Sequence, residues 1–285
     1  MTTVAHPGTT SPPGELNPAP GSRGSGTPRE WNWAHVLVAQ LFLLAALIGI
    51  WQAAAFFGWG RAMIVRSPIE VWDAGIELFT GGELLPALAS TLQATVIGMA
   101  IAGSLGVVIG LALALSPRVE RVVNPFLTAM NSAPRVAFAP VFIVAFGIGQ
   151  TSKIALAVSV VIFVVILNSR AGVYAADADV RRLMTVLGSS KFQIFCKLLF
   201  PVAVPSIFAG LRLGLIYALL GVVTSEMIAA QAGMGQLVSA YSGNFQLAHV
   251  YAVIITLIIV ATALNGIAGY IERRLLWWQP PAERN

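Results

Sequence analysis

Charged residues are scarce in this 285-residue chain. Asp, Glu, Lys and Arg make up only 10% of it, whereas apolar residues make up 57%. Soluble globular domains carry about 25% charged and about 45–50% apolar residues. Because so little charge cannot cover the surface of a protein of this length, the composition argues against a water-soluble enzyme. Apolar runs of about 20 residues cross a bilayer as helices, so we expect an all-α integral membrane protein.

Cysteine and histidine are also too few for most metal or redox chemistry. The single cysteine, Cys196, allows neither a disulfide within the chain nor a cysteine metal cluster, and the three histidines lack metal-ligand spacing. Residues 147–153 resemble a phosphate-binding loop only superficially, because no glycine directly precedes Lys153. We therefore expect no metal site, no catalytic residue and no nucleotide hydrolysis by this chain. Any energy for transport must come from an ion gradient or from another subunit.

The chain divides into a polar tail and a series of apolar runs. Residues 1–30 contain six prolines and no aromatic residue, so they cannot bury enough apolar area to offset their chain entropy and are predicted to be a disordered tail. A transmembrane domain at 31–278 and a second tail at 279–285 follow. The domain contains six apolar runs, each a predicted span, at 35–57, 93–115, 125–146, 154–167, 207–228 and 250–271.

Two of these runs depart from a regular span. The third contains Pro134 and Pro140, which remove backbone hydrogen bonds that lipid cannot replace. Such a helix must be shielded by its neighbours or line a cavity, and both a kinked structural helix and a helix beside a pathway remain open. The fourth run is short.

The basic residues predict the orientation in the membrane. With the N-terminus inside, twelve Lys and Arg residues lie on the inner side, whereas the outer side holds Arg61, Arg66 and Lys153. Positive charge is concentrated in cytoplasmic loops, so both termini are predicted to be cytoplasmic, with interfacial anchors at Trp31, Trp33, Trp277 and Trp278. The acidic, Trp-containing segment between the first two runs suits an amphipathic helix at the outer interface.

Small residues recur at every fourth position of the second run. This spacing lets helix backbones approach closely in lipid, so the row predicts helix packing and no chemistry. Its members are Ala94, Gly98, Ala102, Gly106, Gly110 and Ala114.

The inner segment at about 177–201 has the most informative pattern. Residues 178–187 are predicted to form a helix capped by Asp177 or Asp179, and Gly188 can end it in a left-handed turn. A second helix at 191–200, capped by Ser189 or Ser190, should end before Pro201 and Pro205. It carries Phe192, Phe195, Leu198 and Leu199 on one side. The pair forms either a compact knob facing the cytosol or a hairpin on the membrane surface.

The spacing of Gly188, Leu198, Phe200 and Pro201 resembles the cytoplasmic loop of binding-protein-dependent ABC importer permeases. The Glu-Ala-Ala triplet of that family is replaced here by residues 182–184, Arg-Leu-Met. Further matches, to the sulfonate, nitrate and taurine branch, extend the resemblance over about 68–278. They are Pro134, Pro140, Gly147, Lys153, Pro201, Pro205, the Gly-Leu-Arg of 210–212, Glu226, the Gly-Met-Gly of 233–235 and the tail at 272–278.

The resemblance implies a type I importer permease in the inner membrane, with six transmembrane helices and short cytoplasmic coupling helices. It implies two permease chains, cytosolic ATPase subunits that hold ATP and Mg, and an extracytoplasmic binding protein that delivers a small solute such as a sulfonate, nitrate or taurine. The chain itself would bind lipid, but no cofactor and no nucleic acid. The coupling residues would be Asp179, Arg182, Gly188, Phe192, Phe195, Leu198 and Pro201.

Polar residues near the ends of the spans are candidates for a pathway or gate. They are Asn131, Arg135, Glu226, Gly233 and Gly235. Glu226 is expected to be partly solvated, and it either holds the following Gly-rich turn or contacts the solute or binding protein. Arg135 and Asn131 either line the path or join helices, and Asn265 has the same alternatives. Arg212 should anchor at the interface or pair with Asp177 or Asp179.

Two other functions compete with the permease. An ion-coupled transporter would use Glu226 as its proton site, but such proteins usually contain internal repeats, and the two halves of this chain show no convincing similarity. A membrane enzyme would need a cluster of polar residues at one membrane face, which the sequence lacks.

Overall fold

The computed structural model describes residues 33–58 and 66–277. The two predicted tails, together with Trp31 and Trp278, lie outside these residues. The chain divides into two units, 1–50 and 51–285. The described part of the first unit belongs to one apolar helix, α1 (Trp33–Phe56), whose residues up to Ile50 are almost all exposed. A helix of 24 residues is long enough to cross a bilayer.

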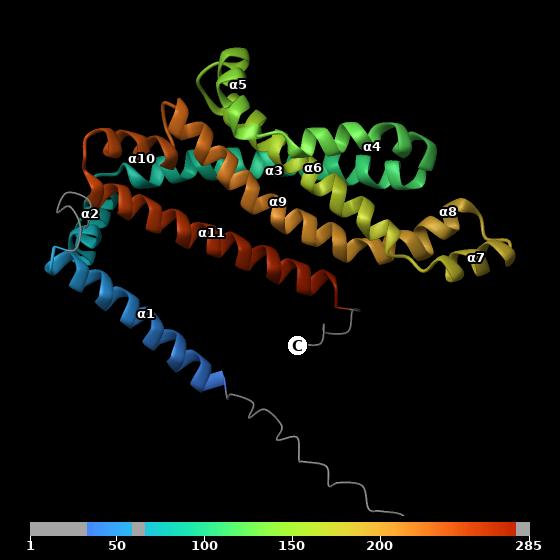
Figure 1. Ribbon diagram of the computed structural model, residues 1–285, viewed down its shortest axis with the longest axis horizontal. Helices are drawn as coiled ribbons and strands as arrows, with labels where there is room; N and C mark the ends of the chain where they lie inside the picture. Colours follow the sequence, from blue (N-terminus) through green and yellow to red (C-terminus); the bar gives the residue numbers. More distant parts are fainter. Residues whose placement is uncertain (1–32, 59–65, 278–285) are drawn as a thin grey trace, which may run out of the picture. The chain divides into compact units, whose positions relative to one another are not determined.

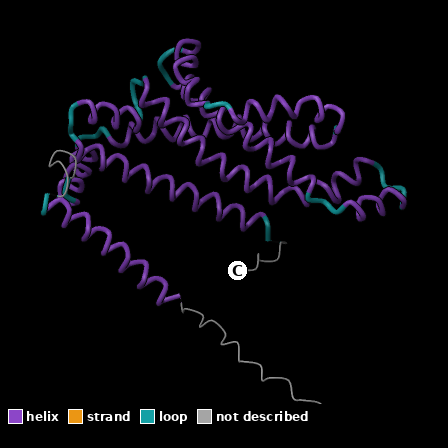
Figure 2. Tube along the Cα trace, viewed as in Figure 1, coloured by secondary structure: helices purple, strands orange, loops and turns teal. Residues whose placement is uncertain are grey.

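The second unit is helical throughout its described residues, with short turns between the helices (Figures 1 and 2). In chain order its elements are α2 (Pro68–Thr80), α3 (Leu84–Leu115), α4 (Pro117–Ser132), the 3₁₀ turn η1 (Arg135–Phe138), α5 (Ala139–Phe146), α6 (Gln150–Tyr174), α7 (Ala178–Val186), α8 (Lys191–Ile194), the π-helical turn η2 (Phe195–Leu199), α9 (Phe200–Ile228), α10 (Met234–Gly243) and α11 (Leu247–Leu275).

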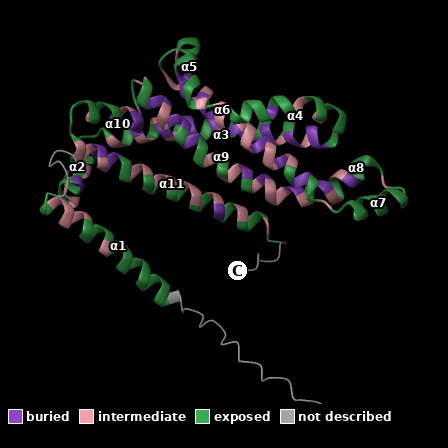
Figure 3. Cartoon of the chain, in the orientation of Figure 1, coloured by how far each residue is buried: buried purple, intermediate pink, exposed green. Residues whose placement is uncertain are grey.

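The centre of this unit is the packing of α3, α6 and α9, along which most buried residues lie (Figure 3). The predicted row of small residues on α3 is fully buried. A Cβ atom on Gly98 would lie 2.7 Å from Cβ of Ala157, and one on Gly110 would lie 2.7 Å from the carbonyl oxygen of Ile166. Both neighbours belong to α6, so the row packs α3 against α6 at backbone distance, as its spacing predicts.

Within 33–58 and 66–277, five helices are long and apolar enough to span a membrane, and a sixth span exists if the bent pair 117–132 and 135–146 counts as one. This pair is bent by 82° at the predicted proline break. Ala133 is extended (φ −68°, ψ 136°) because it precedes Pro134, and Pro140 lies in the first turn of α5, where no amide donor is needed. The fourth span is longer than predicted, at 25 residues.

The predicted amphipathic helix between the first two spans is present as α2. Ser67 caps it by accepting a hydrogen bond from the Glu70 amide at 3.2 Å. Its apolar face buries Val71, Ala74 and Leu78 in a cluster with residues of α10 and α11. On the polar side, Glu77 contacts His249 at the start of α11 at 3.2 Å.

The helix pair predicted at 177–201 is present, but it ends differently. Asp177 caps α7, Gly188 is left-handed at φ +80°, and Ser190 forms a capping box with Gln193 at α8. The prediction that the second helix ends before Pro201 and Pro205 is wrong. The chain passes from α8 through η2 directly into α9, because the wider π-helical turn of η2 accommodates Pro201, and Pro205 lies inside α9.

Candidate functional site

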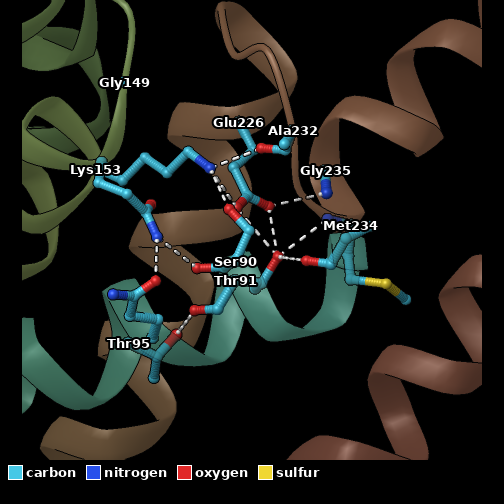
Figure 4. A network of polar contacts seen from close by, with 12 residues as sticks. Ser90, Thr91, Thr95, Gly149, Lys153, Glu226, Ala232, Met234 and Gly235 are labelled. Carbon is cyan, nitrogen blue, oxygen red and sulfur yellow. Dashed lines mark hydrogen bonds and ion pairs between the residues drawn. The ribbon is translucent and has the colours of Figure 1, made fainter. Parts of the chain in front are cut away.

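A buried ion pair joins α6 to α9 at the end of the second unit that also holds α10 (Figure 4). Lys153 Nζ lies 3.0 Å from Glu226 Oε1, and the two side chains are 3% and 0% exposed. The prediction that Glu226 is partly solvated was therefore wrong, and Lys153, predicted just before the fourth run, lies inside α6. Both lie in regular helix, one turn from its end, where neighbouring helices cover them.

The ammonium group of Lys153 uses all three of its N–H donors. It donates to Glu226 Oε1 at 3.0 Å, to Ser90 Oγ at 3.0 Å and to the carbonyl oxygen of Ala232 at 2.6 Å. A lysine ammonium has three donors and no acceptor. Its hydrogen-bonding capacity is therefore filled by α3, α9 and the segment after α9.

The carboxylate of Glu226 is equally well bound. Its Oε2 accepts from the Gly235 amide at 2.9 Å and lies 2.9 Å from the hydroxyl oxygen of Thr91. Thr91 Oγ1 in turn accepts from the Met234 amide at 2.9 Å. The backbone amides of Met234 and Gly235, the first two residues of α10, therefore donate to Thr91 and Glu226. The negative charge of Glu226 also complements the positive N-terminal end of the helix dipole.

Gly233 and Gly235 fit around this carboxylate. Gly233 has φ 131°, and a Cβ atom there would overlap the Glu226 carboxylate. A Cβ atom on Gly235 would lie 2.7 Å from the Cβ of Glu226. The structure thus brings together Glu226, Gly233 and Gly235, which the sequence singled out. A side chain at either glycine would displace the buried carboxylate.

This arrangement ties α9 and α10 to α3 and α6. The carboxylate is buried, paired with a lysine and hydrogen-bonded to an amide, and such charge-assisted hydrogen bonds are strong. The geometry therefore favours the structural alternative for Glu226. Sequence reasoning missed Ser90 and Thr91 altogether, and the only available signal was that an ionisable residue such as Lys153 borders an apolar run.

The other pathway candidates lie elsewhere. Arg135 lies over the ring of Phe163, 3.9 Å from its centroid, and donates to the carbonyl oxygens of Ser159 and Met130. Ser159 follows Lys153 by six residues, or about 9 Å of helix. Arg135 thus joins the bend after α4 to α6, while Asn131 is exposed.

Arg212 does not pair with Asp177 or Asp179, so that one of its two predicted alternatives is wrong. Its Nε donates to Asn265 Oδ1 at 2.7 Å, and its Nη1 lies 3.5 Å from Glu272 Oε2. Arg212 and Asn265 therefore join α9 to α11, which supports the helix-joining alternative for Asn265.

The helices α7 and α8 lie at the opposite end of the second unit (Figure 1), and their apolar side chains form an exposed surface. We call it the loop surface, and its members are Leu183, Val186, Leu187 and Phe192, which are 57%, 84%, 74% and 74% exposed. Phe195 does not extend it, because its ring packs against that of Phe200 at 5.9 Å. Leu198 packs on the core beneath and Pro201 lies in α9, while Asp179 and Arg182 form an exposed ion pair at 3.4 Å.

Comparison with known proteins identifies the family. Residues 105–277 match the model of the binding-protein-dependent transport system inner membrane component. A permease protein assigned to aliphatic sulfonate transport in Bacillus subtilis is 30% identical over 239 residues, covering 84% of this chain and 87% of the relative. The formylaminopyrimidine transport permease protein ThiX of Halalkalibacterium halodurans is 30% identical over 248 residues, covering 85% and 96%. Permeases named for taurine and nitrate also match.

A solved structure has the same fold. A chain of the MetNI methionine ABC transporter in an inward-facing conformation superimposes with a TM-score of 0.60 at 17% identity, covering 67% of this chain and 95% of that one. The chain therefore belongs to the family of binding-protein-dependent transport system inner membrane components, and it is a multi-pass permease subunit of an ABC importer and not an enzyme.

Proposed function

We propose that two copies of this chain form the pathway of an importer in the inner membrane, with both termini in the cytosol. A pair of cytosolic ATPase subunits binds and hydrolyses ATP with Mg, and an extracytoplasmic protein delivers the solute. Membership of the family supports the two kinds of partner. The positive charge on the inner segments supports the orientation.

One observation carries the coupling part of the proposal. The loop surface lies beside the place where α9 continues through η2 into the short helix α8. A continuous helix transmits a displacement of its end, and exposed apolar side chains mark a protein or membrane contact. The ATPase subunit is the proposed partner of Leu183, Val186, Leu187 and Phe192.

The solute is proposed to be a small anion such as a sulfonate. Permeases named for aliphatic sulfonates, taurine and nitrate support this class. However, a relative is also named for a formylaminopyrimidine, so related permeases serve solutes of different charge. Because the polar side chains in the described part of the spans mostly form hydrogen bonds within their own helix or to a neighbouring helix, selectivity is expected to reside in the binding protein.

The coupling proposal is tested by substitutions at two glycines with the same backbone. Gly188 (φ +80°) and Gly82 (φ +76°) are both left-handed, with open space where a Cβ atom would lie. Valine at either position strains the backbone by about 1–2 kcal/mol. We expect Gly188→Val to lose co-purification with the ATPase subunit and Gly82→Val to keep it, since Gly82 lies in the turn before α3 at the other end.

Two further variants separate the contact from the fold. Gly188→Asn should retain the complex, because Asn tolerates the left-handed region. Phe192→Asp should lose the ATPase while keeping normal membrane abundance. If Gly188→Val and Phe192→Asp both keep the ATPase, the coupling proposal is wrong. For the solute, a strain lacking the gene should fail to grow on sulfonates as sole sulfur source; normal growth on them would contradict the proposed anion class.

A further inference from the structure

We propose that Lys153 and Glu226 are positioning residues that hold the α9–α10 connection, residues 229–233, closed over the ends of α3 and α6. This inference rests on the proposed function only in assuming that the held segment serves transport. It assigns the buried ion pair a role in fixing a conformation, apart from any role in stability.

The connection has few other ties. Within 229–233 the backbone hydrogen bonds besides those of the cluster are made at its two ends, from the Ala229 amide to Ser225 and from Leu237 to the Gly233 carbonyl. Gln231 and Ala232 are exposed. In the described part of the chain, the middle of the connection is therefore tied through one polar contact, the 2.6 Å bond from Lys153 Nζ to Ala232.

Glu226 makes that contact possible. Lys153 is 2% exposed, and an unpaired ammonium group is costly to bury. With Glu226 at 3.0 Å the charge is balanced, and the third N–H of the ammonium remains available for the carbonyl oxygen of Ala232. The same carboxylate fixes the far end of the connection through the Gly235 amide.

Stability alone does not explain this arrangement. Buried ion pairs can often be replaced by uncharged residues of similar size without loss of stability, whereas removing one partner is strongly destabilising. A pair of apolar residues could not donate a hydrogen bond to the Ala232 carbonyl, as the Lys153 ammonium group does.

The test measures how often the connection opens, in purified protein in nanodiscs. Met234 is 0% exposed and its amide is bound to Thr91, so a cysteine introduced by Met234→Cys reacts with a maleimide only when the connection opens. The background is Cys196→Ser, which removes the chain's single native cysteine. Each variant is characterised by its labelling rate and its melting temperature.

The decisive variant is the double substitution Lys153→Met with Glu226→Gln. It should melt near the temperature of the parent protein, because no unpaired charge is left. The cysteine at position 234 should nevertheless be labelled about tenfold faster, the factor expected when one charge-assisted hydrogen bond is lost. If the pair serves stability only, the double variant will be labelled at the parental rate, and the proposal is overturned.

A second pair of variants tests the same segment without altering any charge. Thr91 and Thr95 are both buried on α3, but the Thr95 hydroxyl bonds only within its own helix, at 2.8 Å to the Thr91 carbonyl. Thr91→Val should accelerate labelling of the introduced cysteine, and Thr95→Val should not. Equal labelling in both would also overturn the proposal.

The outcome can be told apart from failure of the proposed function. The double variant should still co-purify with the ATPase subunit, since the loop surface lies at the other end. Loss of that complex in the unmodified chain would contradict the proposed coupling and leave the labelling result intact. Impaired growth of the double variant on the same sulfonates would extend the role of the pair to transport.

Discussion

The packing of α3 on α6 makes a quantitative prediction about two glycines. A Cβ atom on Gly110 would lie 2.7 Å from the Ile166 carbonyl oxygen and 2.7 Å from the Cβ of Ser169. The first of these is backbone and cannot move aside without shifting the helix. A Cβ atom on Gly266, in α11, would have no atom within 4 Å. The two sites are otherwise alike, because both lie inside long apolar helices.

Alanine should therefore have opposite effects at the two positions. It relieves a glycine penalty of about 0.5–1 kcal/mol in either helix, but overpacking at Gly110 costs about 1–3 kcal/mol. For a protein of this size, 1 kcal/mol changes the melting temperature by about 2–4 °C. We expect Gly110→Ala to lower the melting temperature by several degrees and Gly266→Ala to raise it by about 1–4 °C.

Thermal unfolding in nanodiscs, followed by circular dichroism, measures both changes under one condition. The informative quantity is the difference between the two variants, because the gain from replacing a helical glycine by alanine is common to both. If Gly110→Ala is as stable as Gly266→Ala, then α3 and α6 do not approach at backbone distance, and the packing described above is incorrect.

Two further predictions concern single polar groups. The hydroxyl of Ser169 is buried without a hydrogen-bond partner, so Ser169→Ala should leave the melting temperature unchanged or raise it slightly; a drop of several degrees would reveal a missed partner. Burial, together with the hydrogen bond to Glu83, raises the pKa of Tyr241 to about 12 from its ordinary value of 10. The folded state then keeps this proton more tightly than the unfolded state, so its contribution is complete below pH 10 and is lost between about pH 10 and 12. The fall in melting temperature over that range should be smaller in Tyr241→Phe, and an unchanged pH profile would contradict the assignment.

Features determined by a few neighbouring residues were predictable from the sequence. The helix at 178–187, a cap at Asp177 or Asp179 and the left-handed Gly188 all follow from local capping rules. The structure selects Asp177 and agrees on the helix within one residue. The row of small residues on α3 was also identifiable, because its spacing repeats along one helix.

Features that depend on contacts between distant segments were not predictable. Lys153 and Glu226 are 73 residues apart, and Thr91 is 135 residues from Glu226. No periodicity relates such positions, so the lysine was placed just before the fourth run and the threonine was overlooked. The continuity of α8 with α9 was missed for another reason. Proline usually ends a helix, but η2 absorbs the irregularity by bonding the Phe200 amide to the Phe195 carbonyl, five residues back.

The two ends of the second unit are connected through α6 and α9. Glu226 lies in the last turn of α9, and the first residue of α9 directly follows η2 and α8. The 29 residues of α9, from Phe200 to Ile228, span about 44 Å. Along this length α9 cannot slide freely on α6, because a Cβ on Gly172 would lie 2.8 Å from the Ala203 carbonyl oxygen and one on Gly210 would lie 2.5 Å from Asn168 Cβ. A displacement of α8 by an ATPase subunit would therefore be carried by α6 and α9 together. Because Lys153 is on α6 and Glu226 is on α9, the ion pair would move with both helices and carry the α9–α10 connection with it.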